Sequence, residues 1–400
     1  MTHRYLKPES RALLALLAAL VALGPLSVDM YIPAMPSMMT ALGTDISSMH
    51  LTLSTYLAGF AIFHLVCGPL ADRFGRRPVL IGGTILFVAA CLGCAFSTTV
   101  EELMIYRFIQ GVGACVGPTL ARTVARDVFG PTRAARALSL IAMLMALAPA
   151  VAPTLGGILL LWLPWPVVFV FLAIYGTAMV ALIHVFLPES LPVRQSLHPV
   201  SIARNYRTLF RDPLFLQVTL ASSMIYAGLF TYLSSSSFVY INMLGVPVQY
   251  FGFIFLTSVA GYMLGSAISA RLARSHPSEY TVLTGVGIAA GSMSAMLVGS
   301  TLWPMSIAAL MLPMIFYSTS MGLVLPNAMA IALRPFPQIA GTASAMLGFI
   351  QMGISGLASG LIGVLLADTP EPMVYQMSAI TLIAVLLSLN LYRSNKRSQP

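Results

Sequence analysis

Long runs of apolar residues recur along this chain, with short polar connections between them. Each run extends over about 20 residues, which is the length that an α-helix needs to cross the hydrocarbon core of a bilayer. The runs are continuous and do not alternate between apolar and polar positions, so they exclude a transmembrane β-barrel. The pattern predicts an all-α membrane protein with twelve transmembrane helices at 12–36, 51–71, 78–98, 103–125, 137–160, 165–187, 214–241, 249–271, 280–300, 304–331, 341–365 and 373–392.

The composition supports a membrane protein. Of the 400 residues, 58% are hydrophobic and 8% are charged, whereas a soluble domain contains about 25% charged residues. The four cysteines, Cys67, Cys91, Cys94 and Cys115, all lie in apolar runs. Cys91 and Cys94 form a CxxC pair, but no second pair or neighbouring histidine completes a metal site. We therefore predict that the cysteines are small packing residues and that the protein holds no metal.

The basic residues fall on one side of this twelve-helix arrangement. They precede the first run, follow runs two, eight, ten and twelve, and lie in the connections between runs four and five and runs six and seven. Because basic loops remain in the cytoplasm, the distribution predicts that both termini are cytoplasmic. It also explains the net charge of +9 without a nucleic-acid partner. The opposite connections contain no Lys or Arg and carry the acids Asp45, Glu101, Glu102, Asp368 and Glu371.

Two charged residues break this pattern, because Asp29 and Arg107 lie within apolar runs. Counted along a helix from the nearest basic end, they lie about 27 Å and about 22 Å deep, so they meet if helices one and four are neighbours. Burial disfavours the charged carboxylate and a nearby arginine favours it, which makes Asp29 a candidate proton site. Two alternatives stay open: helix one ends near Ile32 and leaves Asp29 at the interface, or Arg107 extends outward to water.

The chain divides at its longest polar connection, which is basic and rich in proline. We predict an N-terminal six-helix bundle at 1–190, a cytoplasmic linker at 191–213 and a C-terminal six-helix bundle at 214–400. A faint internal repeat supports this division, because helices five and eleven both open with small residues and a shared serine, Ser139 and Ser344. Two parallel repeats of this kind are one of the layouts of secondary transporters.

The most specific string is "GPLADRFGRRPVL", from Gly68 to Leu80 in the turn after the second run. Glycine permits a tight turn and a close backbone approach, and an acid near a helix N-terminus stabilises that end of the helix. The two consecutive arginines have a candidate acidic partner at the end of run four. A basic anchor with a turn is the simpler alternative, but it does not explain the spacing. The residues concerned are Gly68, Asp72, Arg73, Gly75, Arg76, Arg77 and Asp127.

This turn resembles the loop between helices two and three of the major facilitator superfamily. "RFIQGVGA", which begins at Arg107, resembles the helix-four motif of its proton-coupled drug exporters. "LAPAVAPTLGG" resembles the helix-five motif of its antiporters, although Ala152 stands where a glycine is usual. "DMYIPAMP" and the stretch from Pro326 to Gly348 are similar to the Bcr/CflA branch, the bicyclomycin and chloramphenicol type of bacterial drug:proton antiporter. The matching helix-five residues are Pro149, Pro153, Gly156 and Gly157.

The resemblance implies two pseudo-symmetric six-helix bundles that give alternating access to a central cavity. It implies that Asp29 is a proton site, that Arg107 tunes it, and that the loop after helix two acts as a conformational lock. The proton gradient would drive transport without a cofactor, and no phosphate-binding glycine-rich loop indicates ATP coupling. The expected partners are a small drug, a proton and membrane lipid, with no nucleic acid, and we expect a monomer.

Helices seven and ten face the cavity in proteins of this fold, and they contain aromatic residues. Aromatic and methionine side chains most often pack between helices, but they also form adaptable binding surfaces. Our candidates for drug contact are Met143, Tyr226, Phe230 and Tyr317. We interpret His64 as a helix contact in preference to a second proton site.

The function that we expect is proton-coupled efflux of small antibacterial drugs across the bacterial inner membrane. Two alternatives remain: a dedicated exporter of an endogenous metabolite or siderophore with the same fold, and a membrane sensor or scaffold that transports nothing. The sequence contains no nucleophile–base constellation or metal-ligand spacing, so we do not expect an enzyme.

Overall fold

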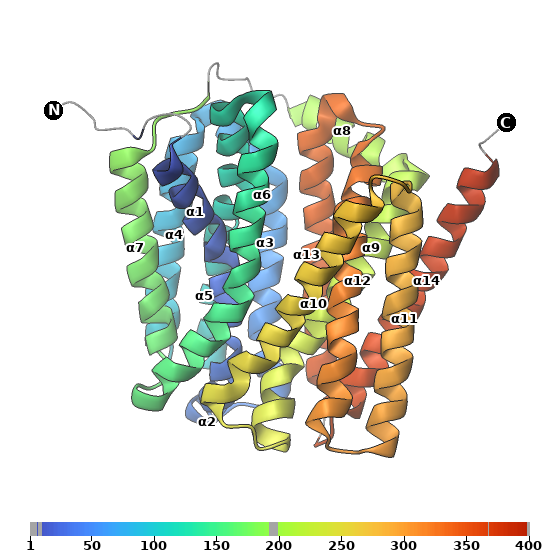
Figure 1. Cartoon of the computed structure of the whole chain (residues 1–400). Coiled ribbons are helices and arrows are strands. Elements are labelled where there is room, and N and C mark those ends of the chain that lie inside the picture. Colours follow the sequence, from blue (N-terminus) through green and yellow to red (C-terminus); the bar gives the residue numbers. More distant parts are fainter. Residues whose placement is uncertain (1–5, 7–9, 192–198, 367, 398–400) are drawn as a thin grey trace. The chain divides into compact units, whose positions relative to one another are not determined.

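The computed structural model describes residues 6, 10–191, 199–366 and 368–397. In this part of the chain the regular elements are all helical (Figure 1). The α-helices are α1 (Arg11–Asp29), α2 (Met35–Leu42), α3 (Ile46–Phe74), α4 (Arg76–Phe96), α5 (Val100–Ala114), α6 (Val116–Trp162), α7 (Val167–Phe186), α8 (Pro199–Arg211), α9 (Pro213–Ser237), α10 (Phe251–Leu272), α11 (Ser278–Leu302), α12 (Ile307–Leu333), α13 (Ala340–Leu365) and α14 (Glu371–Arg397). Short helical segments η1 (Ile32–Ala34), η2 (Phe238–Met243), η3 (Val248–Tyr250) and η4 (Pro337–Ile339) complete them.

Ten of the described helical segments are long and apolar enough to cross a membrane. They correspond to ten of the twelve predicted spans. The other two, 103–125 and 137–160, fall on α5 and α6. The break that we expected at 126–136 is absent, because α6 is helical throughout its 47 residues. The intervening sequence is rich in Ala and Arg, which favour helix. Cβ atoms at Gly117 and Gly156 would meet Leu20 and Met30 of the first span, which lie only about 15 Å apart along it. The helix α6 therefore turns back on itself, and its two halves lie on the fourth and fifth predicted spans.

Contacts between residues divide the chain into two compact units. Unit 1 contains the residues up to Thr44 and those from Thr55 to Pro199, and unit 2 contains Asp45–Ser54 and the residues from Val200 onward. The second boundary falls inside the stretch that we expected to be a linker, where the structure has α8. The helix α3 belongs to both units, because its first turns pack with unit 2 and the remainder packs with unit 1.

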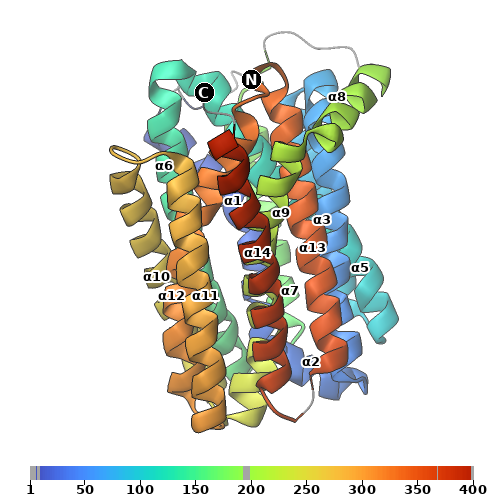
Figure 2. The same ribbon diagram turned by 90° about the vertical axis from the view of Figure 1, so that its right-hand side faces the viewer.

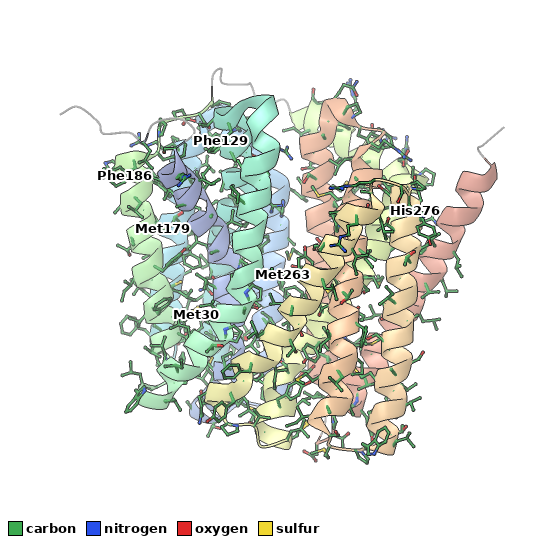
Figure 3. The ribbon with its side chains drawn as sticks, in the orientation of Figure 1. Met30, Phe129, Met179, Phe186, Met263 and His276 are labelled. Carbon is green, nitrogen blue, oxygen red and sulfur yellow. The ribbon has the colours of Figure 1, made fainter. Side chains whose placement is uncertain are left out.

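Each unit is a bundle of helices with apolar side chains between them. In unit 1, α1 packs along α6 and α7, and α4 packs against α5 and α7. In unit 2, α9 packs against α13 and α14, and α12 lies between α10 and α11 (Figure 2). Apolar side chains also cover the outer faces of the helices (Figure 3), as expected for surfaces that meet lipid. The functional candidates of each unit are described separately below.

Candidate functional site

The first membrane span is interrupted directly after Asp29. The helix α1 ends at this residue, η1 follows, and α2 continues to Leu42. Prolines at positions 25, 33 and 36 explain the interruption, because proline lacks the N–H group that a helix interior requires. Helical segments extend for thirteen residues beyond Asp29, and the whole span runs from Arg11 to Leu42. The acid therefore lies within the span, and the span does not end near Ile32.

The side chain of Asp29 is buried, with 4% of its surface exposed. Met30, the next residue, is also buried (Figure 3). Neither a hydrogen bond nor an ion pair joins the Asp29 carboxyl group to another residue in the described parts of the chain. An ionised carboxylate without a partner is very costly in such surroundings. The site therefore favours the neutral, protonated acid in this conformation.

Arg107 is completely buried on α5. Its Nη1 atom donates hydrogen bonds to the backbone oxygen of Ser27 at 3.2 Å and to Oε1 of Gln110 at 2.6 Å. The guanidinium carbon lies 4.2 Å from the ring centre of Tyr31 and 4.4 Å from that of Tyr56. At these distances both rings attract the cation. The Nε and Nη2 atoms have no hydrogen-bond partner among the described residues.

Asp29 and Arg107 lie in the same region of unit 1 but do not form an ion pair in the described structure. Arg107 contacts Ser27 and Tyr31, which are two residues before and two residues after the acid. Residues four apart share a face of a helix, whereas a residue two positions along points about 200° around it. Arg107 therefore meets one face of helix one while Asp29 lies on another.

Further contacts hold the arginine in place. The side-chain amide of Gln110 donates to the sulfur of Cys91 at 3.1 Å, which fixes the oxygen that Arg107 uses. The hydroxyl group of Tyr56 donates to the backbone oxygen of Gly24 at 3.3 Å, linking α3 to α1. Sequence reasoning missed the roles of Tyr31, Tyr56 and Cys91. Tyr31 follows the acid by two positions, which was a usable signal, but nothing in the sequence joins Tyr56 to Arg107.

The glycine at position 111 explains how α5 comes so close to α3. A Cβ atom at Gly111 would lie 2.9 Å from the carbonyl carbon of Tyr56 and 3.0 Å from the backbone nitrogen of Phe60. Any side chain here would force the helices apart. The "RFIQGVGA" string therefore supplies the arginine, its hydrogen-bonding glutamine and the close approach that brings Tyr56 to the guanidinium group.

The predicted helix-five motif lies in the second half of α6. Pro153, Gly156 and Gly157 are buried and Pro149 is half-buried. A Cβ atom at Gly156 would lie 2.8 Å from the backbone oxygen of Met30, so α6 packs directly on the break that follows Asp29. The side chain of the predicted contact Met143 lies outside the described residues.

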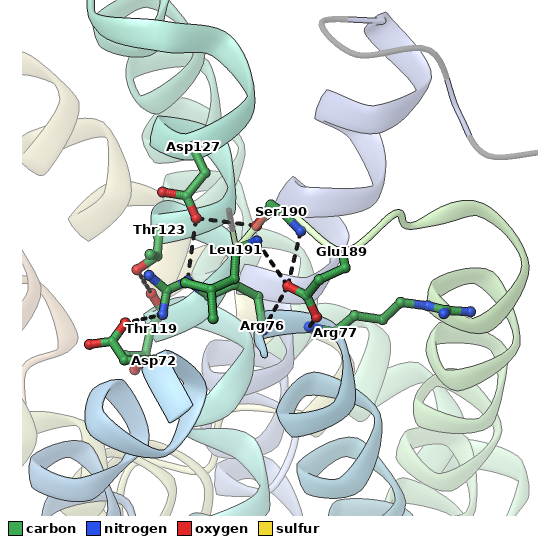
Figure 4. A network of polar contacts seen from close by, with 9 residues as sticks. All are labelled: Asp72, Arg76, Arg77, Thr119, Thr123, Asp127, Glu189, Ser190 and Leu191. Atoms are coloured by element: carbon green, nitrogen blue, oxygen red, sulfur yellow. Dashed lines mark hydrogen bonds and ion pairs between the residues drawn. The ribbon is translucent and has the colours of Figure 1, made fainter. Parts of the chain in front are cut away.

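The signature loop forms a polar network at one end of unit 1 (Figure 4). Arg76 forms ion pairs with Asp72 and with Asp127, whose Oδ2 lies 3.3 Å from Nε. The carboxylate of Glu189 accepts hydrogen bonds from the backbone N–H groups of Arg76 at 2.9 Å and Arg77 at 3.2 Å. These groups form the start of α4, where the helix dipole favours a negative charge. The network thus joins α3, α4, α6 and the segment after α7.

Two expectations for this loop need correction, the cap of α4 and the close approach at Gly68. Glu189, and not Asp72, caps the start of α4, because Asp72 lies one turn before Arg76 and pairs with it. A Cβ atom at Gly68 would have open space around it, so no close approach requires glycine at this position. Arg73 is exposed and lies over the ring of Phe74 at 5.3 Å. Sequence reasoning missed Glu189, because it lies more than a hundred positions away in the sequence.

Gly75 is the glycine of this loop whose conformation matters. Its φ angle is 106°, which L-amino acids with a side chain rarely adopt. A Cβ atom here would also collide with the Glu189 carboxylate and lie 3.2 Å from the ring of Pro78. Both the turn and the capping carboxylate therefore require glycine.

The candidate drug contacts of unit 2 differ in their surroundings. The hydroxyl group of Tyr317 donates to the backbone oxygen of Ile225 at 2.8 Å, and the ring is completely buried against Gly228. Tyr317 is thus a contact between α12 and α9 in this structure. Tyr226 is half-buried and Phe230 is buried, and their ring centres lie 5.2 Å apart. In unit 1, His64 packs against Phe60 at 5.9 Å.

These features define a multi-pass membrane transporter built from two helical units. Residues 17–360 match the Major Facilitator Superfamily, to which the chain belongs. It is 29% identical to a bicyclomycin resistance protein homolog of Haemophilus influenzae, over 96% of both chains. It is 30% identical to a chloramphenicol resistance protein of Pseudomonas aeruginosa, covering 95% of this chain and 90% of the relative.

Solved structures agree on the fold. The D-xylose-proton symporter superposes with a TM-score of 0.73 at 16% identity, covering 95% of this chain and 97% of that one. The sequence matches place the protein with the Bcr/CflA-like drug:proton antiporters of the superfamily. It is a multi-pass transporter of the inner membrane.

Proposed function

We propose that this protein exports small antibacterial drugs from the cytoplasm in exchange for protons, by alternating access and with both termini in the cytoplasm. The names of its relatives support a drug as cargo, and the distribution of basic loops supports the orientation. One observation carries the proton coupling: a carboxyl group is buried inside a span without a partner, next to a buried arginine that also lacks an acidic partner.

The coupling follows from the cost of an unpaired buried charge. In the conformation described here, Asp29 is stable when it is protonated. When it loses its proton, the carboxylate needs a donor, and Arg107 offers the unpartnered Nε and Nη2 groups. Pairing requires helix one to turn or unwind at the break after Asp29, because the two side chains lie on different faces. Loss of the proton thereby changes the shape of helix one.

This exchange links the drug to the proton gradient. The proton enters from the periplasm, where its concentration is higher, and neutralises Asp29. Drug that enters from the cytoplasm favours the conformation in which Asp29 is ionised and paired, so the proton leaves to the cytoplasm. Only one acid of this kind occurs inside a described span, so we propose one proton for each drug molecule. We also propose that the monomer is the working unit.

The test is proton release when drug is added to purified protein in weakly buffered detergent solution. A susceptibility panel in an efflux-deficient host, including chloramphenicol and bicyclomycin, first identifies the compound to use. The wild type is expected to release about one proton for each drug bound, and Asp29→Asn none, although it still binds drug. Asp45→Asn is the control, because Asp45 is an exposed acid at the start of α3. Full release from Asp29→Asn would refute the proton site.

The same experiments separate the alternative functions. A metabolite exporter would leave the host susceptible to every drug of the panel, yet it would release protons when its own cargo is added. A sensor or scaffold would neither protect the host nor release protons. Either result would overturn drug export while leaving the membrane fold unaffected.

A further inference from the structure

A second buried titratable group lies in the first turns of α3. His50 is completely buried. It belongs to Asp45–Ser54, the part of α3 that packs with unit 2. Its ring stacks on Phe238 of η2, with ring centres 5.5 Å apart and an angle of 27° between the planes. On α13, Gly363 lies so close to the His50 side chain that no Cβ atom fits between them.

Both ring nitrogens of His50 lack a hydrogen-bond partner among the described residues. On the facing helix α13, the backbone of Ser359 lies near the ring and is the one acceptor that faces it, and Gly363 contributes no polar side chain. On η2 the facing group is the ring of Phe238. A histidine normally orients one nitrogen toward an acceptor or a donor, so this environment is unusual.

The charged groups at this end of unit 2 do not reach the ring. Asp45 caps α3, where its Oδ1 accepts a hydrogen bond from the backbone N–H of Ser48 at 2.7 Å. Glu371 begins α14 and is exposed. Asp368 lines an open pocket whose other residues are Ile46, Phe238, Asn242, Met243 and Met305. Phe238, on whose ring His50 stacks, therefore lines the same pocket as Asp368.

The packing of His50 and its protonation exclude each other. An imidazolium ion in this position would be a buried charge that faces one backbone acceptor and no counter-ion among the described residues, which is very costly. A neutral imidazole loses only its hydrogen bonds to water. The contact between α3 and α13 therefore persists only while His50 is neutral, and a proton on the ring favours separation of the two helices.

The course of α3 connects this contact to transport. Because one helix runs from unit 2 into unit 1, a movement of unit 1 relative to unit 2 must withdraw its first turns from α13 or bend it near Ser54. Withdrawal would expose His50 to water, and histidine titrates in the range of physiological pH. In the proposed orientation, that water is the periplasmic solution.

We propose that His50 is a second protonation site, which binds a proton from the periplasmic solution when the first turns of α3 leave α13. It returns that proton to the same solution before the helices pack together again. His50 therefore adds no proton to the net exchange, which remains one for Asp29. It instead makes the outward-open state more populated at low external pH. This inference rests on the proposed alternating access but not on the role of Asp29.

The test measures the distance between α3 and α13 by electron-spin spectroscopy in detergent, with labels at Ser47 and Leu365. All four native cysteines are buried and free, so introduced surface cysteines react preferentially. The measurements use an Asp29→Asn background, which removes the other proton site from the pH response. An exposed imidazole has a pKa of about 6.5, so the ratio of open to closed molecules is expected to rise about tenfold between pH 8 and pH 5.5.

Two substitutions of His50 make the test specific. His50→Phe retains a ring that stacks on Phe238, His50→Gln retains a polar group, and neither side chain titrates. Both are expected to abolish the pH response while drug-induced proton release by the otherwise native protein persists. His276→Gln is the control, because this histidine lies in the connection between α10 and α11 (Figure 3).

Three results would overturn the proposal. The first is that the Asp29→Asn protein with native His50 shows no pH response of the distance. The second is that the response survives both His50→Phe and His50→Gln. The third is that His276→Gln loses the response to the same extent as the His50 variants. A failure of Asp29→Asn to abolish proton release would contradict the proposed function alone, because the distance measurement does not depend on it.

Discussion

The substitution Arg107→Lys tests the arrangement around the buried arginine. Lysine keeps the positive charge but replaces the planar guanidinium group with a compact ammonium group. In the wild type, one nitrogen of Arg107 bonds both Ser27 and Gln110, and the flat group lies against Tyr31 and Tyr56. The shorter lysine cannot occupy the space between both rings and also reach both oxygens. The variant therefore keeps the positive charge but loses contacts that only the planar guanidinium group can make.

The size of the effect follows from the contacts that are lost. A hydrogen bond that involves a charged group contributes about 1.5–3 kcal/mol. We expect the variant to lose one such bond, and we expect that bond to be needed when helix one rearranges. Because about 1.4 kcal/mol corresponds to a tenfold change in rate, transport should slow by about 10- to 150-fold. A purely electrostatic role for Arg107 would leave the rate nearly unchanged.

The assay is drug-induced collapse of the pH gradient in everted membrane vesicles, with transporter amounts matched by immunoblotting. Arg334→Lys is the control, because Arg334 is an exposed residue whose Nη2 pairs with Glu279 at 2.8 Å. Exposed ion pairs contribute little, so the control should retain the wild-type rate within about twofold. If Arg107→Lys also transports within twofold of the wild type, the reasoning from guanidinium geometry fails.

Three further predictions concern positions with defined surroundings. Gly75→Ala should lower the stability of unit 1 by about 1–3 kcal/mol, measured by thermal unfolding, because alanine is strained at φ 106° and ψ 152°; an unchanged melting temperature would contradict this. Gly111→Ala should impair transport by separating α5 from Tyr56, as measured by pH-gradient collapse, and wild-type activity would contradict the close approach. Asp45→Ala should cost about 1 kcal/mol at pH 7 through loss of the cap. Because the hydrogen bond from the Ser48 N–H lowers the pKa of Asp45, that difference should shrink as the pH falls below about 4 in thermal unfolding experiments; a constant difference would contradict it.

Much of the fold could be predicted from the sequence, because bilayer thickness imposes one length on every apolar run. Ten of the spans lie where the apolar runs predict them. The exception is informative: the connection between the fourth and fifth predicted spans is itself helical, as part of α6. Polar, basic sequence there indicated a loop, but polarity reports contact with water and not backbone conformation. Arginine and alanine both have a high helix propensity, so a polar, basic segment can be helical.

The contacts around the signature loop were less predictable. Pairing of Arg76 with Asp127 followed from the one acid at the end of run four, and the structure contains this pair. Glu189 was not predicted, because a capping carboxylate needs only to lie near a helix N-terminus in space. Nothing in its neighbouring sequence distinguishes it from an ordinary loop residue after the sixth span.

The same reasoning explains why the sequence predicts how far Asp29 and Arg107 lie along their helices but not the directions in which their side chains point. Depth along a span depends on the number of residues, which the sequence contains. The direction in which a side chain points depends on how its helix is rotated about its own axis. The proline-rich break after Asp29 allows this rotation to change locally. Arg107 meets the face of Ser27 and Tyr31, so a rotation of helix one by about half a turn would exchange that face for Asp29. A span that is broken at its only acid permits such a rotation locally, without moving the rest of α1 against α6.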